Sequence, residues 1–282
     1  MLRTFVLSFT TVLLTFPAFA VDQKTQAVKN KFYRPRLTRT PGQTKPKDSG
    51  GAVALNAASF EPGVSPGGLV TIFGSDLTSV NGVVIANTNP LPLRLANVQV
   101  TIAGIPAPIY SIAYTNGQDQ ISVQTPYDTP TGPGAAEIQV YDGNVLTADF
   151  LADSFTEDPG IFTYKGNFAI AEAADYSLIG PDNPAIPGEP LTLYVTGLGP
   201  LTLDMNDGYG SPTQPPFAQT IDPFDVIVDG EKCSVFFSGL APGFVGLYQV
   251  NFYVPRDAAN GDLSIYIQSP YANSATGTLP VR

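Results

Sequence analysis

Apolar and polar residues alternate most clearly in residues 248–254. Every second position is apolar, at Tyr248, Val250, Phe252 and Val254, with Gln249, Asn251 and Tyr253 between them. A period of two positions is typical of a strand with one buried face. Pro242 and Gly243 are turn formers ahead of this stretch, and Pro255 ends it because proline cannot donate to a sheet ladder. The pattern predicts a turn followed by a buried strand.

Weaker copies of this pattern occur earlier in the chain. Gln120, Ile121, Val123 and Pro126 match Gln249, Val250, Phe252 and Pro255 in type and in relative position. In the same way, Pro66-Gly67 precedes Val70, Ile72 and Gly74 as Pro187-Gly188 precedes Leu191, Leu193 and Val195. These repeats predict one β unit that is used twice.

The remaining segments are short apolar runs that alternate with Gly/Pro turns. Asp142-Gly143 and Asp229-Gly230 are strong hairpin dipeptides, and no segment has a sustained helical period. We therefore predict an all-β protein with two tandem immunoglobulin-like antiparallel β-sandwiches, at residues 52–157 and 158–282, which meet near Pro159-Gly160.

Residues 1–20 have the pattern of a secretory signal peptide. Arg3 is followed by an apolar run from Phe5 to Phe16 and by the small-x-small site Ala18-Phe19-Ala20. An uncleaved anchor is the alternative. The run is too short to span a bilayer, and no other run in the sequence is long and apolar enough to do so. We predict a bacterial protein that is secreted or associated with the cell envelope and has no transmembrane segment.

Charge is segregated along the chain. Residues 21–48 contain eight basic and two acidic residues, whereas residues 49–282 contain five basic and 22 acidic residues. Residues 21–51 lack aliphatic periodicity, which predicts a flexible basic linker. The alternative is that residues 21–48 tether the protein to an anionic envelope polymer. The acidic part of the chain, residues 49–282, would repel phosphates, so we expect no binding to nucleic acid.

The composition disfavours catalysis. The chain has no His, which removes the Ser-His and Cys-His pairs and the usual general base near neutral pH. Cys233 is in phase with Val235 and Phe237, so we expect a buried thiol. A pair of carboxylates could still act as acid and base, but nothing in the spacing of the 24 acidic residues selects a pair. We do not expect an enzyme.

Four stretches resemble one protein family: 56–77 (NAASFEPGVSPGGLVTIFGSDL), 90–112 (PLPLRLANVQVTIAGIPAPIYSI), 183–200 (NPAIPGEPLTLYVTGLGP) and 239–255 (GLAPGFVGLYQVNFYVP). This is the uncharacterised C-terminal domain of Solibacter-type acidobacterial secreted proteins, and the resemblance covers roughly residues 54–281. It implies two immunoglobulin-like units similar to IPT/TIG domains, and it implies no catalytic residues. Members usually follow other extracellular modules, whereas here only the basic segment precedes the pair. The stretch Gly117-Gln118-Asp119-Gln120 also lacks the preceding proline of the family pattern.

Two groups of residues are candidates for binding. Asp204, Asn206 and Asp207 lie in a loop with Gly208 and Gly210, and their oxygens could hold calcium. The spacing is one residue short of an EF-hand loop and lacks its distal Glu, so a solvated turn is the alternative. Tyr194, Tyr253 and Tyr266 could form a binding surface that stacks on sugars or on a partner protein. The alternative is that these tyrosines pack between the two sandwiches.

The leading hypothesis for function is a secreted, non-catalytic binding or scaffold protein of the adhesion type. A second hypothesis is a carbohydrate-binding accessory protein of a polysaccharide-degrading system. A third is a hydrolase of unrecognised type. The partner is an extracellular protein or glycan in the first two cases.

Overall fold

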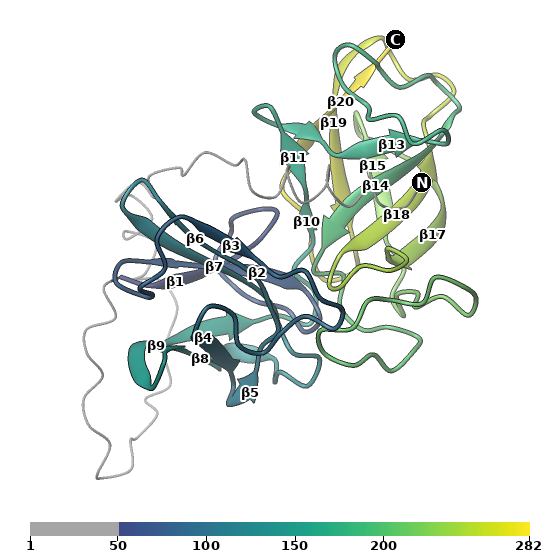
Figure 1. Cartoon of the computed structure of the whole chain (residues 1–282). Coiled ribbons are helices and arrows are strands. Elements are labelled where there is room, and N and C mark those ends of the chain that lie inside the picture. Colours follow the sequence, from purple (N-terminus) through teal and green to yellow (C-terminus); the bar gives the residue numbers. More distant parts are fainter. Residues whose placement is uncertain (1–50) are drawn as a thin grey trace. The chain divides into compact units, whose positions relative to one another are not determined.

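The computed structural model describes residues 51–282, and this part of the chain contains strands, turns and bends but no helix (Figure 1). The predicted all-β class is therefore confirmed. The predicted signal peptide and the proposed tether lie outside the described residues, as does all of the predicted linker except Gly51. Within residues 51–282, nothing forms a helix of the length and apolarity that a membrane span requires.

The first half of the described chain, residues 52–157, contains two sheets. Sheet A has the strand order β1-β2-β7-β6-β3, and sheet B has the order β5-β4-β8-β9. The strands are β1 (Val53–Asn56), β2 (Leu69–Gly74), β3 (Val83–Ile85), β4 (Val98–Ile102), β5 (Ile105–Pro106), β6 (Ile109–Thr115), β7 (Gln118–Gln124), β8 (Gly132–Asp142) and β9 (Val145–Ser154). All pairings in both sheets are antiparallel.

The second half, residues 158–282, also contains two sheets. Sheet C has the order β10-β14-β18-β17, with β13 also paired to β14, and sheet D has the order β11-β12-β20-β19-β15-β16. The strands are β10 (Gly160–Ile161), β11 (Thr163–Tyr164), β12 (Phe168–Ala169), β13 (Ala171–Ala173), β14 (Pro190–Thr196), β15 (Asp225–Val228), β16 (Glu231–Lys232), β17 (Ser234–Leu240), β18 (Tyr248–Tyr253), β19 (Gly261–Gln268) and β20 (Gly277–Val281). The β12–β20 pairing is parallel, and the others are antiparallel.

Buried apolar residues form two separate clusters, one in each half. The first cluster draws on strands of sheets A and B, and the second draws on strands of sheets C and D. Two sheets that share one core between them are the layers of a β-sandwich. All described residues nevertheless belong to one compact unit, so the predicted boundary between residues 157 and 158 stays a prediction.

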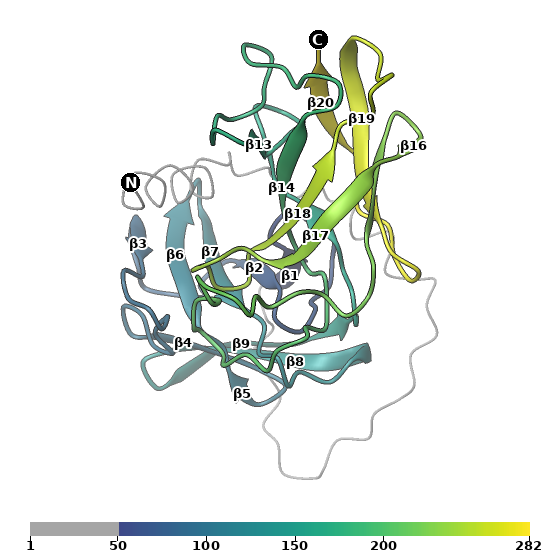
Figure 2. The same cartoon turned by 90° about the vertical axis from the view of Figure 1, so that its right-hand side faces the viewer.

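The repeated alternating stretches form the central strands β7 and β18. Strand β7 lies between β2 and β6, and β18 lies between β14 and β17 (Figure 2). Phe252 is completely buried and Tyr253, on the opposite face of β18, is exposed, as the alternation predicts. Each central strand also faces a β-bulge in its neighbour, at Tyr110 in β6 and at Phe236 in β17. A bulge places an extra residue on one strand and redirects its side chain.

Buried hydrogen bonds join the two halves. The backbone N–H of Leu69 donates to Oγ1 of Thr196 over 2.8 Å, and that hydroxyl donates to the carbonyl oxygen of Gly246 over 2.9 Å. The hydroxyl of Tyr110 donates to the carbonyl oxygen of Val245 over 2.8 Å. The bonds of Thr196 are buried and that of Tyr110 is partly buried, and together they fix one half against the other at specific atoms.

Candidate functional site

Two aromatic side chains lie exposed next to each other on sheet C. Phe236 is 52% exposed and Tyr253 is 45% exposed. Their ring centroids are 4.9 Å apart, and the ring planes are inclined by 41°. Both positions follow from the local backbone, because Phe236 is the bulge residue of β17 and Tyr253 is an outward residue of β18. A pair of half-exposed aromatic rings is a contact surface with little polar character.

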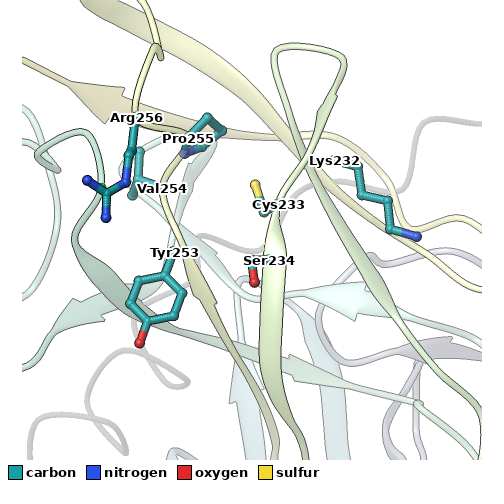
Figure 3. A pocket seen from close by; sticks show the side chains of 8 residues that line it. Lys232, Cys233, Ser234, Tyr253, Val254, Pro255 and Arg256 are labelled. Carbon is teal, nitrogen blue, oxygen red and sulfur yellow. The ribbon is translucent and has the colours of Figure 1, made fainter.

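A pocket of about 310 Å³ lies beside this pair, where β17 and β18 separate (Figure 3). The exposed Tyr253 and the buried residues Cys233 and Val254 are among those that line it. Gly188 lines another part, and a Cβ added to this glycine would lie 3.5 Å from Cγ of Arg256. The aliphatic part of the Arg256 side chain therefore lies close to the backbone at Gly188.

Two cationic side chains line the pocket, and they differ in how their charge is balanced. Nζ of Lys232 lies 2.7 Å from Oδ2 of Asp225 and forms an ion pair. Among the remaining basic residues of the described chain, Arg94 and Arg282 bind oxygen atoms and Lys165 lies over an aromatic ring. Within residues 51–282, no hydrogen bond or ion pair engages the Arg256 guanidinium. This group therefore has its N–H donors available to an anion.

Cys233 does not add a reactive group to this pocket. Its side chain is buried, as predicted from its phase with Val235 and Phe237. Burial raises the pKa of the thiol to about 11, with a smaller opposing contribution from a backbone hydrogen bond at Val228. With this pKa, Cys233 stays protonated near neutral pH. The thiol is therefore not in its nucleophilic form, the thiolate.

The three candidate tyrosines do not form one exposed row. Tyr253 is exposed on sheet C, but Tyr194 is only 6% exposed, and its hydroxyl donates to Oε2 of Glu172 over 3.0 Å. Tyr266 lies in β19 of sheet D and is partly buried. Tyr194 therefore contributes no exposed ring to the predicted surface. Of the three candidates, Tyr253 is the one that lies at the pocket.

The predicted calcium loop makes a contact between the two halves. Asp204 and Asn206 are exposed, whereas Oδ1 of Asp207 accepts a hydrogen bond from the backbone N–H of Tyr127 over 2.9 Å. Burial raises the pKa of Asp207, and the hydrogen bond from Tyr127 opposes this rise. No group of three or more His, Cys, Asp and Glu side chains in residues 51–282 is placed to hold a metal ion. Calcium binding by this loop stays a prediction, and Asp207 already has a structural role.

Sequence reasoning missed Phe236 and Arg256. Phe236 lies between Val235 and Phe237, which are in phase with the buried Cys233, so the alternation already placed its ring on the outward face. The bulge at Phe236 has no local sequence signal. Arg256 lies directly after Pro255, which ends the strand. The sequence did single it out, because it is one of only five basic residues among the 22 acidic residues of 49–282.

Comparisons with known proteins find only remote similarity. No family model matches the chain, and no curated protein matches it. The resemblance to the acidobacterial C-terminal domain family therefore stays a prediction.

Several solved structures, including the following three, are similar to this chain. One is SGBP-B of the Bacteroides ovatus mixed-linkage glucan utilization locus, in complex with a mixed-linkage heptasaccharide (11% identity, 78% of this chain and 44% of that chain, TM-score 0.31). Another is SGBP-B from a complex xyloglucan utilization locus in Bacteroides uniformis (12% identity, 77% and 46%, TM-score 0.25). The third is the Yersinia pseudotuberculosis adhesin InvE (10% identity, 82% and 59%, TM-score 0.20). The chain spans less than half the length of the two SGBP-B chains, and these similarities are too remote to bear on function.

Proposed function

We propose that this protein is an exported, non-catalytic binding protein that acts by presenting a surface to a partner outside the cell. The observation that carries the proposal is the exposed Phe236–Tyr253 pair beside the pocket. Isolated exposed apolar residues are ordinary, but two aromatic rings in contact beside a concave site are typical of recognition surfaces. The signal peptide predicted from residues 1–20 supports a location outside the cytoplasm.

The chemistry of the chain supports a binding role over catalysis. The sequence has no His. The thiol of Cys233 is held protonated by burial, and the Phe236 and Tyr253 rings supply contact area. Residues 21–48 would, in this proposal, hold the acidic unit near an anionic envelope polymer through screened charge attraction.

A glycan is the second candidate for the partner. Tyr253 could stack on a sugar ring while groups in the pocket bind its hydroxyls. The inclination of 41° between the two rings argues against a flat stacking platform, because a pyranose could lie against only one ring at a time. A protein surface, which can fit around inclined rings, is therefore the first candidate.

The test measures attachment of the mature protein to cell-envelope fragments of its source by co-sedimentation at about 0.5 M salt, where the charge attraction of residues 21–48 is screened. The double variant Phe236→Ser, Tyr253→Ser should lose most of the attachment, whereas Tyr271→Ser is the matched control, since Tyr271 is an exposed tyrosine outside the pair. Thermal unfolding of each variant shows whether it is folded. Attachment by the folded double variant at the level of the unchanged protein would contradict the proposal, as would turnover of an ester or glycoside substrate.

A further inference from the structure

The pocket in the second half is built on a specific backbone framework. The N–H of Gly188 donates to the carbonyl oxygen of Val254, and the N–H of Val254 donates to the carbonyl oxygen of Glu189, each over 3.0 Å. On the other side, the N–H of Cys233 donates to the carbonyl oxygen of Val226 over 2.8 Å. These bonds fix the loop at Gly188 and the chain at Cys233 on either side of the end of β18.

The first half has the same framework. The N–H of Gly67 donates to the carbonyl oxygen of Thr125, and the N–H of Thr125 donates to that of Gly68, each over 2.9 Å. The N–H of Ala107 donates to the carbonyl oxygen of Val100 over 2.9 Å. Gly67, Ala107 and Thr125 thus take the places of Gly188, Cys233 and Val254 in the same set of bonds. The pocket therefore has an equivalent place in the first half.

In the first half, the Asp207-Gly208 turn of the second half fills that place. The N–H of Gly208 donates to Oε1 of Gln124 over 2.7 Å, and Oδ1 of Asp207 accepts the N–H of Tyr127 over 2.9 Å. Gly208 has a φ of +78°, and a Cβ added to it would lie 3.1 Å from Cβ of Pro108. The turn therefore presents a carboxylate oxygen from its first position, and the positive φ and close approach at its second position favour glycine.

The second half presents the equivalent surface with different side chains. Each residue that holds the turn has a counterpart in the pocket, found by counting from the matched framework residues. Pro108 corresponds to Ser234, Gln124 to Tyr253, and Tyr127 to Arg256. Figure 3 shows the Arg256 guanidinium and the Tyr253 ring extending from the segment that ends β18. Where the first half offers Asp207 only a backbone N–H, the second half adds a guanidinium, and an ionised donor makes a stronger hydrogen bond to a carboxylate.

We propose that this pocket binds a turn of another secreted protein in which a carboxylate residue is followed by glycine. Arg256 binds the carboxylate, and the Phe236–Tyr253 pair packs against the residues that flank the turn. The partner is a separate protein because the turn of this chain that fits the framework, Asp207-Gly208, is already bound to its own first half. The inference rests on the proposed binding function and specifies the partner of the same surface.

The experiment uses the isotope-labelled mature chain and a cyclic peptide that copies residues 203–211. Side-chain signals of Arg256 and Tyr253 are followed by NMR as the peptide is added to about 1 mM, where even a weak complex is populated. We expect both signals to shift. A peptide with Asn in place of Asp207 should bind about tenfold more weakly, because it loses a charge-assisted hydrogen bond. A peptide with Ala in place of Gly208 should also bind more weakly.

Variants of the full chain locate the site. Arg256→Gln should weaken binding of the peptide by about tenfold. Arg94→Gln is the matched control, because Arg94 binds Gln99 and the Asn97 carbonyl oxygen in the first half, and it should leave binding unchanged. No shift with the peptide, or equal binding of the peptide with Asn at 207, would overturn the inference.

Two further arms identify other occupants. An oligosaccharide of glucuronic acid that shifts the same signals and depends on Arg256, where the peptide does not, would assign the pocket to a glycan and overturn the inference. Concentration-dependent dimers that Arg256→Gln abolishes would assign it to a second copy of this chain, with the same consequence. If the peptide fails but the aromatic double variant still loses envelope attachment, the inference falls and the proposed function stands. If the peptide binds but the aromatic double variant still attaches to the envelope fragments, the partner does not lie in the envelope.

Discussion

Tyr110 and Phe236 occupy the same bulge position in the two halves, but their surroundings differ. Tyr110 is partly buried, and its hydroxyl binds the Val245 carbonyl oxygen in the other half. Phe236 is half exposed and contacts Tyr253. The same backbone irregularity thus serves a contact within the chain in one half and an open surface in the other. The difference shows that the side chains at equivalent positions of a repeat take different roles when only one copy is covered by the other.

The two cores differ in the same way. The buried cluster of the first half contains only aliphatic side chains, whereas that of the second half includes Phe224, Tyr248 and Phe252. Val123 in β7 corresponds to Phe252 in β18. A single aromatic ring buries more apolar area than valine, so stability of the second half depends more on individual side chains.

A third difference concerns buried polar groups. Glu172 and Tyr194 form a hydrogen-bonded pair on sheet C. The equivalent positions in the first half, by strand register, are the apolar residues Leu55 and Phe73. Of these two equivalent places, only the one in the second half therefore holds a titratable pair.

The largest effect is expected from the core difference. Phe252→Ala should lower the free energy of unfolding by roughly 3–5 kcal/mol, because it removes a fully buried ring and leaves a cavity. Val123→Ala, at the equivalent position, should cost less because it removes fewer buried atoms. Urea denaturation of both variants provides the comparison. Equal losses would show that the two cores do not differ in their dependence on single side chains.

Tyr253→Ala is the control for the face assignment. Tyr253 neighbours Phe252 in the sequence but is 45% exposed on the other side of β18. Its truncation should therefore cost clearly less than that of Phe252. A loss as large as that of Phe252→Ala would mean that Tyr253 supports the fold rather than a binding surface.

The fold could be predicted from the sequence further than the site could. The period of two positions in 248–254 and its earlier copy at 120–126 identified both central strands and the inward face of Phe252. Such patterns are local, and burial follows directly from them. The contact of Asp207 with Tyr127 joins distant parts of the sequence and depends on how the two halves dock. No periodicity reports such a contact, so the loop at Asp207 resembled a metal site instead.

The next effect concerns Glu172 and pH. Burial raises the pKa of Glu172 from its ordinary value of 4.5 to about 7, and the hydrogen bond from Tyr194 partly opposes this rise. Between these two values the folded state binds the proton more tightly than the unfolded state. The contribution of Glu172 to stability is therefore complete below about pH 4.5 and is lost as pH rises through about 7.

Glu172→Gln should flatten this dependence. The variant keeps a neutral hydrogen-bonding group, so its stability relative to the unchanged protein should rise as pH increases from about 5 to about 8. Thermal unfolding over this range provides the measurement. Leu55→Met, at the equivalent apolar position of the first half, is the control and should leave the slope unchanged. A slope that Glu172→Gln does not alter would mean that the pH dependence arises elsewhere.

The smallest effect tests the bulge comparison directly. Tyr110→Phe removes one hydroxyl and leaves the Val245 carbonyl oxygen without its donor, so it should cost about 1–3 kcal/mol, the range for a buried polar group left unpaired. Phe236→Tyr makes the reverse change at the equivalent exposed position and should change stability by less than about 0.5 kcal/mol. Both values come from chemical denaturation of the mature chain. If the two changes had equal effects, the interface bond of Tyr110 would be energetically no different from solvent contact. The first half would then be held to the second by other bonds, such as those of Leu69 with Thr196 and of Tyr127 with Asp207. Exposure of Phe236 would not reflect the loss of a docking role.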